Sequence, residues 1–186
     1  MLKARLLSLA LVAGCGTVEN MSQTLNMQVD GQSLRMDGVI NTRALRQFVQ
    51  TLDDNPGLRE VVLGRIDGSL DDEVVAEMGY TLRERGLATR MLPSSEVFSG
   101  GVDLFLAGVQ RTVPAGAVVG VHEWETSFGS ARDYPRDSRQ HEPTRGYIED
   151  MLGSDAFYWF TVEAASFNDV HVMTRDELIR YGVVTR

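Results

Sequence analysis

A serine stands at the junction between an extended, polar run and an apolar segment in residues 94–108, SSEVFSGGVDLFLAG. A serine hydroxyl attacks an acyl carbon only where a base takes its proton and hydrogen-bond donors hold the oxyanion. A helix that begins at Gly100 offers free backbone N–H groups, and Gly100 lets a substrate approach the backbone closely. Ser99 is therefore a candidate nucleophile. The structural alternative is that Ser99 only caps the helix.

Two further candidates follow the strands expected on either side of Ser99. Gly68 lies in RIDGS, after an expected strand over residues 59–64, and His122 ends the apolar run AVVGVH. Parallel strands place their carboxyl ends at one edge of a sheet, where α/β proteins bind ligands, so these groups are expected to meet there. Gly68 would donate a second hydrogen bond to the oxyanion, and His122 would be the base. In the alternative interpretation Gly68 only allows the chain to turn, and His122 only forms a hydrogen bond with a backbone carbonyl. The G-x-S-x-G motif of ordinary α/β-hydrolases is absent.

The elements that must position these residues alternate along the chain. Two strand-like runs flank Asp30-Gly31, which is typical of a hairpin. Strands are then expected over 59–64, 88–93 and 117–124, separated by helices after Asn41, after the turn at 65–72 and after Ser99. This order predicts an α/β fold with parallel strands and helical crossovers. The consecutive apolar residues 104–106 predict that the helix after Ser99 is buried.

The C-terminal third has a different character. Residues 125–146 are polar and rich in Gly, Pro and charged side chains, which predicts a long surface loop. Helices are expected over 147–153 and 155–167. A last helix is expected to be capped by Thr174, closed by Gly182 and followed by a short strand.

Composition limits the classes of function. The chain has 186 residues, of which 43% are hydrophobic and 24% charged, and these values suit one globular domain. The net charge of -8 argues against a nucleic-acid partner, because phosphate binding requires clustered Lys and Arg. The three histidines are widely separated and no metal-type Cys/His spacing occurs. No metal or cofactor is expected.

The first residues, MLKARLLSLALVAGC, differ from the rest of the chain. A basic start followed by a short apolar run is typical of a secretory signal and is too short to span a bilayer as a helix. The ending LVAGC resembles the bacterial lipobox, which implies lipidation of Cys15. The alternative is an ordinary signal peptide with a chance cysteine. We therefore expect a lipoprotein signal over 1–14, a tether over 15–23 and one domain over 24–186.

This N-terminus implies a location as well. Lipid on Cys15 would anchor the protein to a membrane in the bacterial periplasm. Gly16 follows, and no Asp is present there to suggest retention in the inner membrane, so the outer membrane is expected. Cys15 is the sole cysteine, so a disulfide within the chain is excluded.

Five segments in the right order resemble the Clp protease/crotonase superfamily, and in particular bacterial periplasmic proteins related to the proteolytic subunit of Clp protease. They are LRMDGVIN, VVLGRIDGSLDDEVVAEMGYTLR, SGGVDLFLAG, AGAVVGVHEW and MTRDELIRYGVVT. The resemblance covers most of the chain after the signal. It implies repeated ββα units, peptidase-like acyl transfer by a Ser-His-Asp triad, a peptide substrate and a homo-oligomer.

By position, the resemblance implies that Ser99 is the nucleophile, His122 the general base, and Gly68 and Gly100 the oxyanion donors. Val170 falls where the family has its acid, so the neighbouring Asp169 is the candidate for that role. Asp103, one helical turn after Ser99, is a weaker candidate, and we expect it to be a solvated or capping residue.

The sequence also departs from the family before two of these residues. Asp67 stands where the oxyanion turn usually has its first glycine, and a carboxylate there would oppose an oxyanion. Phe98 stands where a small residue usually precedes the serine, and it would narrow the pocket. Both departures favour a second hypothesis, in which the protein is a catalytically inactive binding or assembly module.

Other chemistry of related proteins fits less well. A serine-lysine dyad is excluded because Lys3, inside the expected signal, is the sole lysine. An acyl-CoA enzyme is disfavoured because the basic residues are not clustered and coenzyme A is not expected outside the cytoplasm. Two hypotheses follow: a lipid-anchored periplasmic serine hydrolase that acts on peptides, or the inactive module.

Overall fold

The computed structural model describes residues 25–185. The expected signal peptide, Cys15 and the tether lie outside the described residues. Within 25–185 no helix is long and apolar enough to cross a bilayer.

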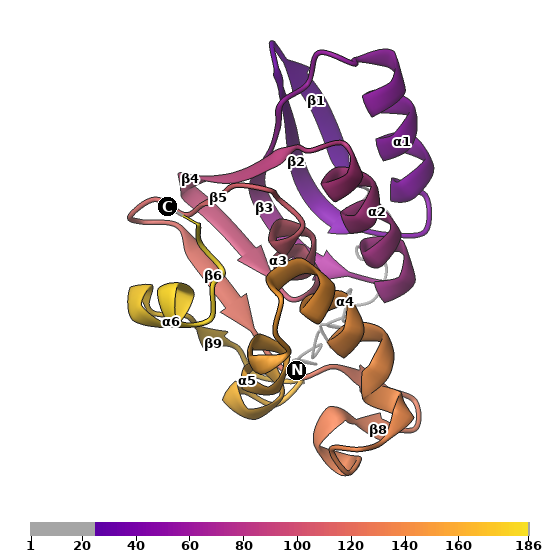
Figure 1. The fold of residues 1–186 in the computed structure, drawn as a ribbon, viewed down its shortest axis with the longest axis vertical. Helices are drawn as coiled ribbons and strands as arrows, with labels where there is room; N and C mark the ends of the chain where they lie inside the picture. The colour runs from indigo at the N-terminus through magenta and orange to yellow at the C-terminus, as the bar shows by residue number, and fades with distance from the viewer. Residues whose placement is uncertain (1–24, 186) are drawn as a thin grey trace, which may run out of the picture.

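One mostly parallel sheet organises the domain, in the order β1-β2-β3-β4-β6-β9, with β5 paired to β4 (Figure 1). The strands are β1 (Asn26–Asp30), β2 (Ser33–Ile40), β3 (Glu60–Ser69), β4 (Ala88–Phe98), β5 (Arg111–Thr112), β6 (Val118–Val121) and β9 (His171–Val172). The neighbours β2, β3, β4 and β6 are parallel, whereas β1 and β9 pair antiparallel at the two edges. The predicted α/β class and the hairpin at Asp30-Gly31 are confirmed.

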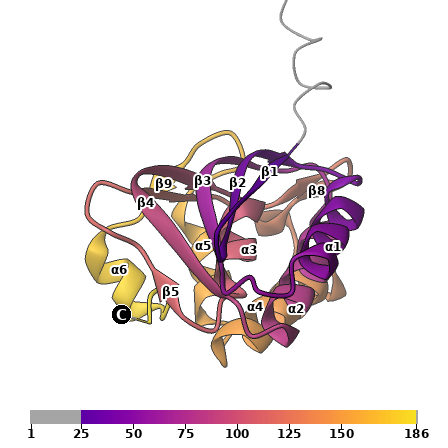
Figure 2. The ribbon, with the colours of Figure 1, turned by 90° about the horizontal axis from the view of Figure 1, so that it is seen from above.

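Helical crossovers connect the parallel strands. The helices are α1 (Ala44–Asp54), α2 (Asp72–Glu84), α3 (Gly100–Leu106), α4 (Glu142–Leu152), α5 (Ala156–Ala164) and α6 (Arg175–Arg180). Figure 2 shows α1, α2 and α4 along the same side of the sheet, with α3 between them and the strands. Leu104, Phe105 and Leu106 are at most 1% exposed, so the predicted burial of the helix after Ser99 is confirmed.

Local sequence explains how several of these elements begin. The Asp71 carboxylate accepts the Val74 N–H and caps α2. Thr174 caps α6 as predicted, in a capping box with Glu177. Asn41 does not cap α1 directly: Arg43 occupies the N-cap position, and the Asn41 side chain, two residues earlier, accepts the Arg43 N–H.

The polar region 125–146 was expected to be a long surface loop or flap, and residues 125–141 are mostly irregular and exposed, but the expectation is wrong from Glu142 on, where α4 begins. It contains a hairpin of β7 (Glu125–Thr126) and β8 (Gly129–Ser130), two short 3₁₀ turns, and the first turn of α4. Pro143 sits in that first turn, where a missing N–H costs nothing. The expected C-terminal strand is also absent from the described residues, and the Thr185 N–H instead donates to the Arg111 carbonyl.

The sheet changes register before it reaches the candidate site. The pairing of β3 with β4 shifts between Leu63 and Arg65, and that of β2 with β3 shifts around Gly38. Such irregularities bend strands and re-aim the residues beyond them. They place the ends of β3 and β4, and with them Gly68 and Ser99, next to each other.

Candidate functional site

Ser99 joins β4 to α3 in a conformation that side chains rarely adopt. Its φ is 51° and its ψ is −128°, and among residues 25–185 it is the sole non-glycine residue with positive φ. Such backbone geometry costs energy and persists only where the surrounding structure holds it. Its N–H donates to the Gly120 carbonyl at 3.1 Å, which ties the junction to β6.

The Ser99 side chain does not cap α3. The hydroxyl makes no cap hydrogen bond, although Ser99 occupies the N-cap position. The alternative interpretation of the sequence, in which Ser99 only caps the helix, therefore lacks the cap hydrogen bond that it requires. A strained serine between a strand and a helix, with a hydroxyl that does not bind the helix N-terminus, is the local arrangement that presents a nucleophile in serine hydrolases.

Gly68 lies directly beside Ser99. With a φ of +124°, it has a backbone that favours glycine, and a Cβ placed there would lie 3.4 Å from the Ser99 Cβ and 3.8 Å from its Oγ. Gly100 is equally constrained, because a Cβ there would collide with the Ser69 side chain. The Gly100 N–H has no backbone acceptor in the part of the chain that the structure describes. The two glycines predicted as oxyanion donors thus flank Ser99.

His122 follows β6, is half-buried, and lines the same pockets as Ser99. Its Nδ1 lies 2.7 Å from the Glu123 carbonyl oxygen. If Nδ1 carries the proton, it donates to this carbonyl and leaves Nε2 with a free lone pair. The Phe167 ring packs edge-on against the imidazole, with 5.4 Å between ring centroids. Among the hydrogen bonds of residues 25–185, none joins His122 to the Ser99 hydroxyl.

Asp169 is not brought to His122. It lies on an exposed turn in which its N–H donates to the Ser166 carbonyl and its carboxylate accepts the Val170 N–H at 2.8 Å. The same turn presents Phe167, not Asp169, to the imidazole. Phe167 and the Glu123 carbonyl are therefore the neighbours of His122 that the sequence analysis missed, and a backbone carbonyl leaves no signal in a sequence.

The two departures from the family pattern lie away from Ser99. Asp67 is exposed and pairs with Arg65 at 2.8 Å, on the opposite side of β3 from the buried Gly68. Phe98 packs over Gly120, where a Cβ would collide with its ring. Neither side chain lines the pockets at Ser99. Phe98 therefore does not narrow these pockets, and the Asp67 carboxylate faces away from them and is paired with Arg65.

Three neighbouring pockets surround the site. A narrow pocket of about 40 Å³ is lined by Ser99, Gly100, Asp103 and His122, among others. A rim pocket of about 220 Å³ is bounded by Ser99, His122 and Phe167 together with the residues at the start of α2. An acidic pocket of about 360 Å³ lies between α2, α3 and α4, and it shares Asp72, Asp103 and Thr144 with the narrow pocket.

Asp103, in the first turn of α3, lines both the narrow pocket and the acidic pocket, and its side chain is partly exposed there. Its side chain is partly buried in the walls of these pockets. Burial, and secondarily the nearby charge of Asp72, raises the pKa of Asp103 to about 7. Its carboxyl group therefore changes charge close to neutral pH.

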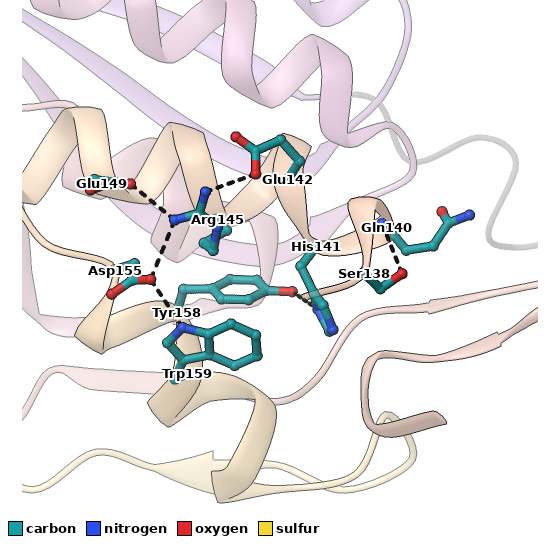
Figure 3. A network of polar contacts seen from close by, with 9 residues as sticks. All are labelled: Ser138, Gln140, His141, Glu142, Arg145, Glu149, Asp155, Tyr158 and Trp159. Carbon is teal, nitrogen blue, oxygen red and sulfur yellow. Dashed lines mark hydrogen bonds and ion pairs between the residues drawn. The ribbon is translucent and has the colours of Figure 1, made fainter. Parts of the chain in front are cut away.

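A buried hydrogen-bond chain holds the segment that closes one side of the site. Trp124, which lines the narrow pocket, donates its Nε1–H to the Tyr158 hydroxyl at 2.8 Å. That hydroxyl lies 2.6 Å from His141 Nδ1 (Figure 3), and His141 Nε2 lies 3.2 Å from the Pro135 carbonyl. Burial raises the pKa of Tyr158 to about 12, so its hydroxyl stays protonated and donates a hydrogen bond to His141 Nδ1. The chain therefore fastens residues 124–141 to α5.

An ion-pair cluster around Arg145 on α4 lies beside this hydrogen-bond chain. Arg145 contacts the carboxylates of Glu142, Glu149 and Asp155 at 2.7–3.3 Å (Figure 3). Asp155 also accepts the Trp159 Nε1–H at 3.0 Å, which connects α4 to α5. These contacts are partly exposed, so each contributes modestly to stability. No group of His, Cys, Asp or Glu between residues 25 and 185 is arranged to hold a metal ion.

Comparison with known structures identifies the fold. A mutant of the 1510-N membrane-bound stomatin-specific protease in complex with a substrate peptide is 13% identical, with a TM-score of 0.53 over 79% of this chain and 72% of that chain. A second mutant of that protease reaches a TM-score of 0.56 at 11% identity, over 82% and 76% of the two chains. An enoyl-CoA hydratase/isomerase from Marinobacter aquaeolei also reaches 0.56 at 12% identity, over 87% and 69%.

These similarities confirm the Clp protease/crotonase fold predicted from the sequence. No protein-family model and no curated protein sequence matches the chain.

Proposed function

We propose that this protein is a serine hydrolase that cleaves acyl bonds in peptides, with Ser99 as nucleophile. The observation that carries the proposal is the strained backbone of Ser99, with a φ of 51°, and its hydroxyl that does not cap α3. A capping serine would need no strain and would use its oxygen on the helix. Exposed apolar side chains at the rim pocket, Leu70 and Phe167, suit a peptide with apolar side chains.

His122 is the general base in this proposal. The Glu123 carbonyl holds the Nδ1 proton. The mechanism requires the Ser99 side chain to turn so that its hydroxyl meets Nε2. Nε2 takes the hydroxyl proton as Oγ bonds to the substrate carbonyl carbon, and the carbonyl electron pair moves onto its oxygen. The N–H groups of Gly68 and Gly100 bind that oxyanion. The imidazolium then gives its proton to the departing amine, and water releases the acyl group by the same steps in reverse order.

The Glu123 carbonyl takes the orienting role that the sequence analysis assigned to Asp169. Its position is fixed, because the Glu123 N–H donates to the Ala165 carbonyl at 3.0 Å and its carboxylate accepts the Arg132 N–H at 2.9 Å. A neutral carbonyl stabilises an imidazolium less than a carboxylate does, so we expect a slow hydrolase. If the turn at 166–169 moved to bring Asp169 to His122, the full triad would form.

The inactive binding or assembly module remains the second candidate. The observation that favours it is that Ser99 and His122 share a pocket without a hydrogen bond between them. Catalytic hydrogen bonds are often long in the absence of substrate, so this geometry alone does not decide between the two.

Labelling with a fluorophosphonate probe tests the proposal, since this reagent modifies an activated serine and ignores a capping one. We expect the wild type to be labelled at Ser99 and the variants Ser99→Ala and His122→Ala to lose about 10³-fold or more in rate, with no further loss in the double variant. Ser94→Ala, an exposed serine in β4, is the matched control and should label normally. An unlabelled wild type would reject the serine hydrolase and favour the inactive binding or assembly module.

Asp169→Asn separates the two forms of the mechanism. If the Glu123 carbonyl orients His122, this variant should label within about threefold of the wild-type rate, whereas loss of a working triad acid costs about 10⁴-fold. A large loss would restore Asp169 to the triad.

We also propose that the protein is anchored to the outer membrane on its periplasmic side by lipid on Cys15. The support is the lipobox-like LVAGC after a basic and then apolar segment. Cys15→Ser should move the protein from the membrane fraction to the soluble periplasmic fraction. Mass spectrometry that finds Cys15 unmodified would overturn this proposal.

A further inference from the structure

The narrow pocket beside Ser99 has room for a small group only. Its volume is about 40 Å³. A cavity of about 10–15 Å³ already holds one water molecule, whereas a cavity that takes benzene measures about 150 Å³. The narrow pocket therefore has space for a short aliphatic or hydroxyl-bearing group and excludes an aromatic ring.

Several walls of this pocket belong to the hydrophobic core. Val102 on α3, Val121 on β6 and Ile148 on α4 line it, and each of these side chains is at most 2% exposed. Close-packed core side chains move only if their neighbours move as well. The pocket therefore does not widen on these sides without disturbing the fold.

Trp124 forms a further wall, on the segment that follows β6, and its side chain is only half-buried. The indole Nε1–H donates to the Tyr158 hydroxyl at 2.8 Å, and the rings of Tyr134 and His141 lie at centroid separations of 5.7 and 5.8 Å. The Trp124 carbonyl also accepts the Ala131 N–H at 3.0 Å. An indole held by these contacts does not swing aside for a larger group, so Trp124 fixes the size of the pocket at this wall.

The narrow pocket adjoins the groups that would react. Ser99 and Gly100, the candidate nucleophile and one oxyanion donor, both line it, whereas Gly100 does not line the rim pocket. In an acyl residue the Cβ atom is only two bonds from the carbonyl carbon, so the side chain begins close to Ser99. The rim pocket, bounded by the exposed Leu70 and Phe167, is left for the departing part of the substrate.

We propose that the narrow pocket receives the side chain of the residue whose carbonyl reacts at Ser99, and that Trp124 limits this side chain to the size of alanine or serine. Thr144 and Thr161 also line the pocket, so its walls are not wholly apolar and tolerate a hydroxyl group. Trp124 is thus a specificity-determining residue. The inference rests on the proposed function, because it concerns the substrate that Ser99 attacks.

Three p-nitrophenyl esters, of Nα-acetyl-alanine, Nα-acetyl-leucine and Nα-acetyl-phenylalanine, test the size limit on the full chain. They share a leaving group and differ in one side chain. The Ser99 hydroxyl proton passes to His122 as Oγ bonds to the ester carbonyl carbon, p-nitrophenolate leaves with the electron pair of the broken bond, and water then releases the acyl group. The absorbance of p-nitrophenolate gives kcat/KM, after subtraction of the rate with Ser99→Ala.

We expect the wild type to prefer the alanine ester over the phenylalanine ester by about 100-fold or more, since one methylene group changes kcat/KM by about 10–200-fold in a fitted pocket. Trp124→Leu removes the indole wall and should reduce this preference by about tenfold or more. Trp159→Leu is the matched control. The Trp159 ring packs against the same His141 at 4.9 Å but does not line the narrow pocket, so this variant should keep the preference.

A second variant covers the case in which Trp124→Leu does not fold. Ile148→Val shortens another wall of the pocket by one methylene group, so it should raise kcat/KM for the leucine ester relative to the alanine ester by about tenfold. An unchanged ratio in Ile148→Val would show that the narrow pocket does not hold the side chain.

Other outcomes would also overturn the proposal. Equal kcat/KM for the three esters in the wild type, or a preference for phenylalanine, would reject the size limit. An alanine preference of wild-type strength in a folded Trp124→Leu variant would show that Trp124 does not set it. Loss of the preference in Trp159→Leu would assign the effect to the whole aromatic cluster around His141 and not to Trp124.

Failure of this inference is distinct from failure of the hydrolase. A wild type that a fluorophosphonate labels at Ser99, but that does not discriminate among the esters, would keep the hydrolase and reject the role of the narrow pocket. An unlabelled wild type that cleaves the esters no faster than Ser99→Ala would reject the hydrolase, and the size limit with it.

Discussion

Replacing Ser99 by glycine should make the protein more stable while removing its candidate nucleophile. A residue held in a sparsely populated region of φ and ψ costs about 1–3 kcal/mol. Glycine adopts positive φ without a steric penalty, but its greater freedom in the unfolded chain costs about 0.5–1 kcal/mol. With Ser99 at a φ of 51°, Ser99→Gly is therefore expected to raise the free energy of unfolding by about 1 kcal/mol.

Ser99→Ala keeps the strain and removes the hydroxyl alone. Because that hydroxyl makes no cap hydrogen bond, the free energy of unfolding should change by less than about 0.5 kcal/mol. Thr174 provides the matched comparison, because it caps α6 and its Oγ1 accepts the Glu177 N–H at 3.3 Å. Thr174→Ala should lose about 1 kcal/mol, as is typical of N-cap removal.

Urea unfolding of the four proteins, followed by circular dichroism at one temperature, measures these differences. The expected order of stability is Ser99→Gly, then wild type and Ser99→Ala together, then Thr174→Ala. A Ser99→Gly variant less stable than the wild type would refute the assignment of strain. A Ser99→Ala variant that loses as much as Thr174→Ala would show that Ser99 is an ordinary cap.

Three further predictions concern the core and the pockets. Phe105→Ala should lower the free energy of unfolding by about 3–5 kcal/mol, because this ring is 1% exposed, and a loss below about 1 kcal/mol in urea would place α3 at the surface. The pKa of Asp103, raised to about 7 from 3.8, means that the folded state binds this proton more tightly than the unfolded state does. The stability of the wild type relative to Asp103→Asn should thus be highest below pH 4 and fall as pH rises through 7, and an unchanged difference between pH 5 and pH 8 in urea unfolding would contradict it. Tyr158→Phe leaves Trp124 and His141 without their shared hydroxyl, so it should cost about 1–3 kcal/mol and speed hydrogen exchange in residues 125–141; exchange at the wild-type rate would argue against the fastening role.

Local signals explain why much of the fold could be predicted from the sequence. Periodic apolar residues, the hairpin dipeptide Asp30-Gly31 and the cap at Thr174 act within a few residues of the elements that they determine. The alternation of strands and helices then placed Ser99, Gly68 and Gly100 together, because parallel strands end at one edge.

The remaining features depend on tertiary contacts. The φ of Ser99 depends on how β4, β6 and α3 hold the junction between them. The orientation of the His122 ring depends on its contact with the Glu123 backbone carbonyl. Asp169 failed to reach His122 because the turn at 166–169 is closed by its own carboxylate. The acidic pocket joins residues of α2, α3 and α4, and no short motif records that packing.

The hydrogen-bond chain through Tyr158 has a spectroscopic consequence. The protein has two tryptophans, and both rings lie against His141, with centroid separations of 5.8 Å for Trp124 and 4.9 Å for Trp159. Arg136 also lies over the Trp159 ring at 4.1 Å. All of the intrinsic tryptophan fluorescence therefore originates beside one buried imidazole, at the edge of the Ser99 pockets. A ligand that moves residues 124–141 will shift the emission spectrum. Structural changes confined to α1 or the β1–β2 hairpin will leave the spectrum unchanged.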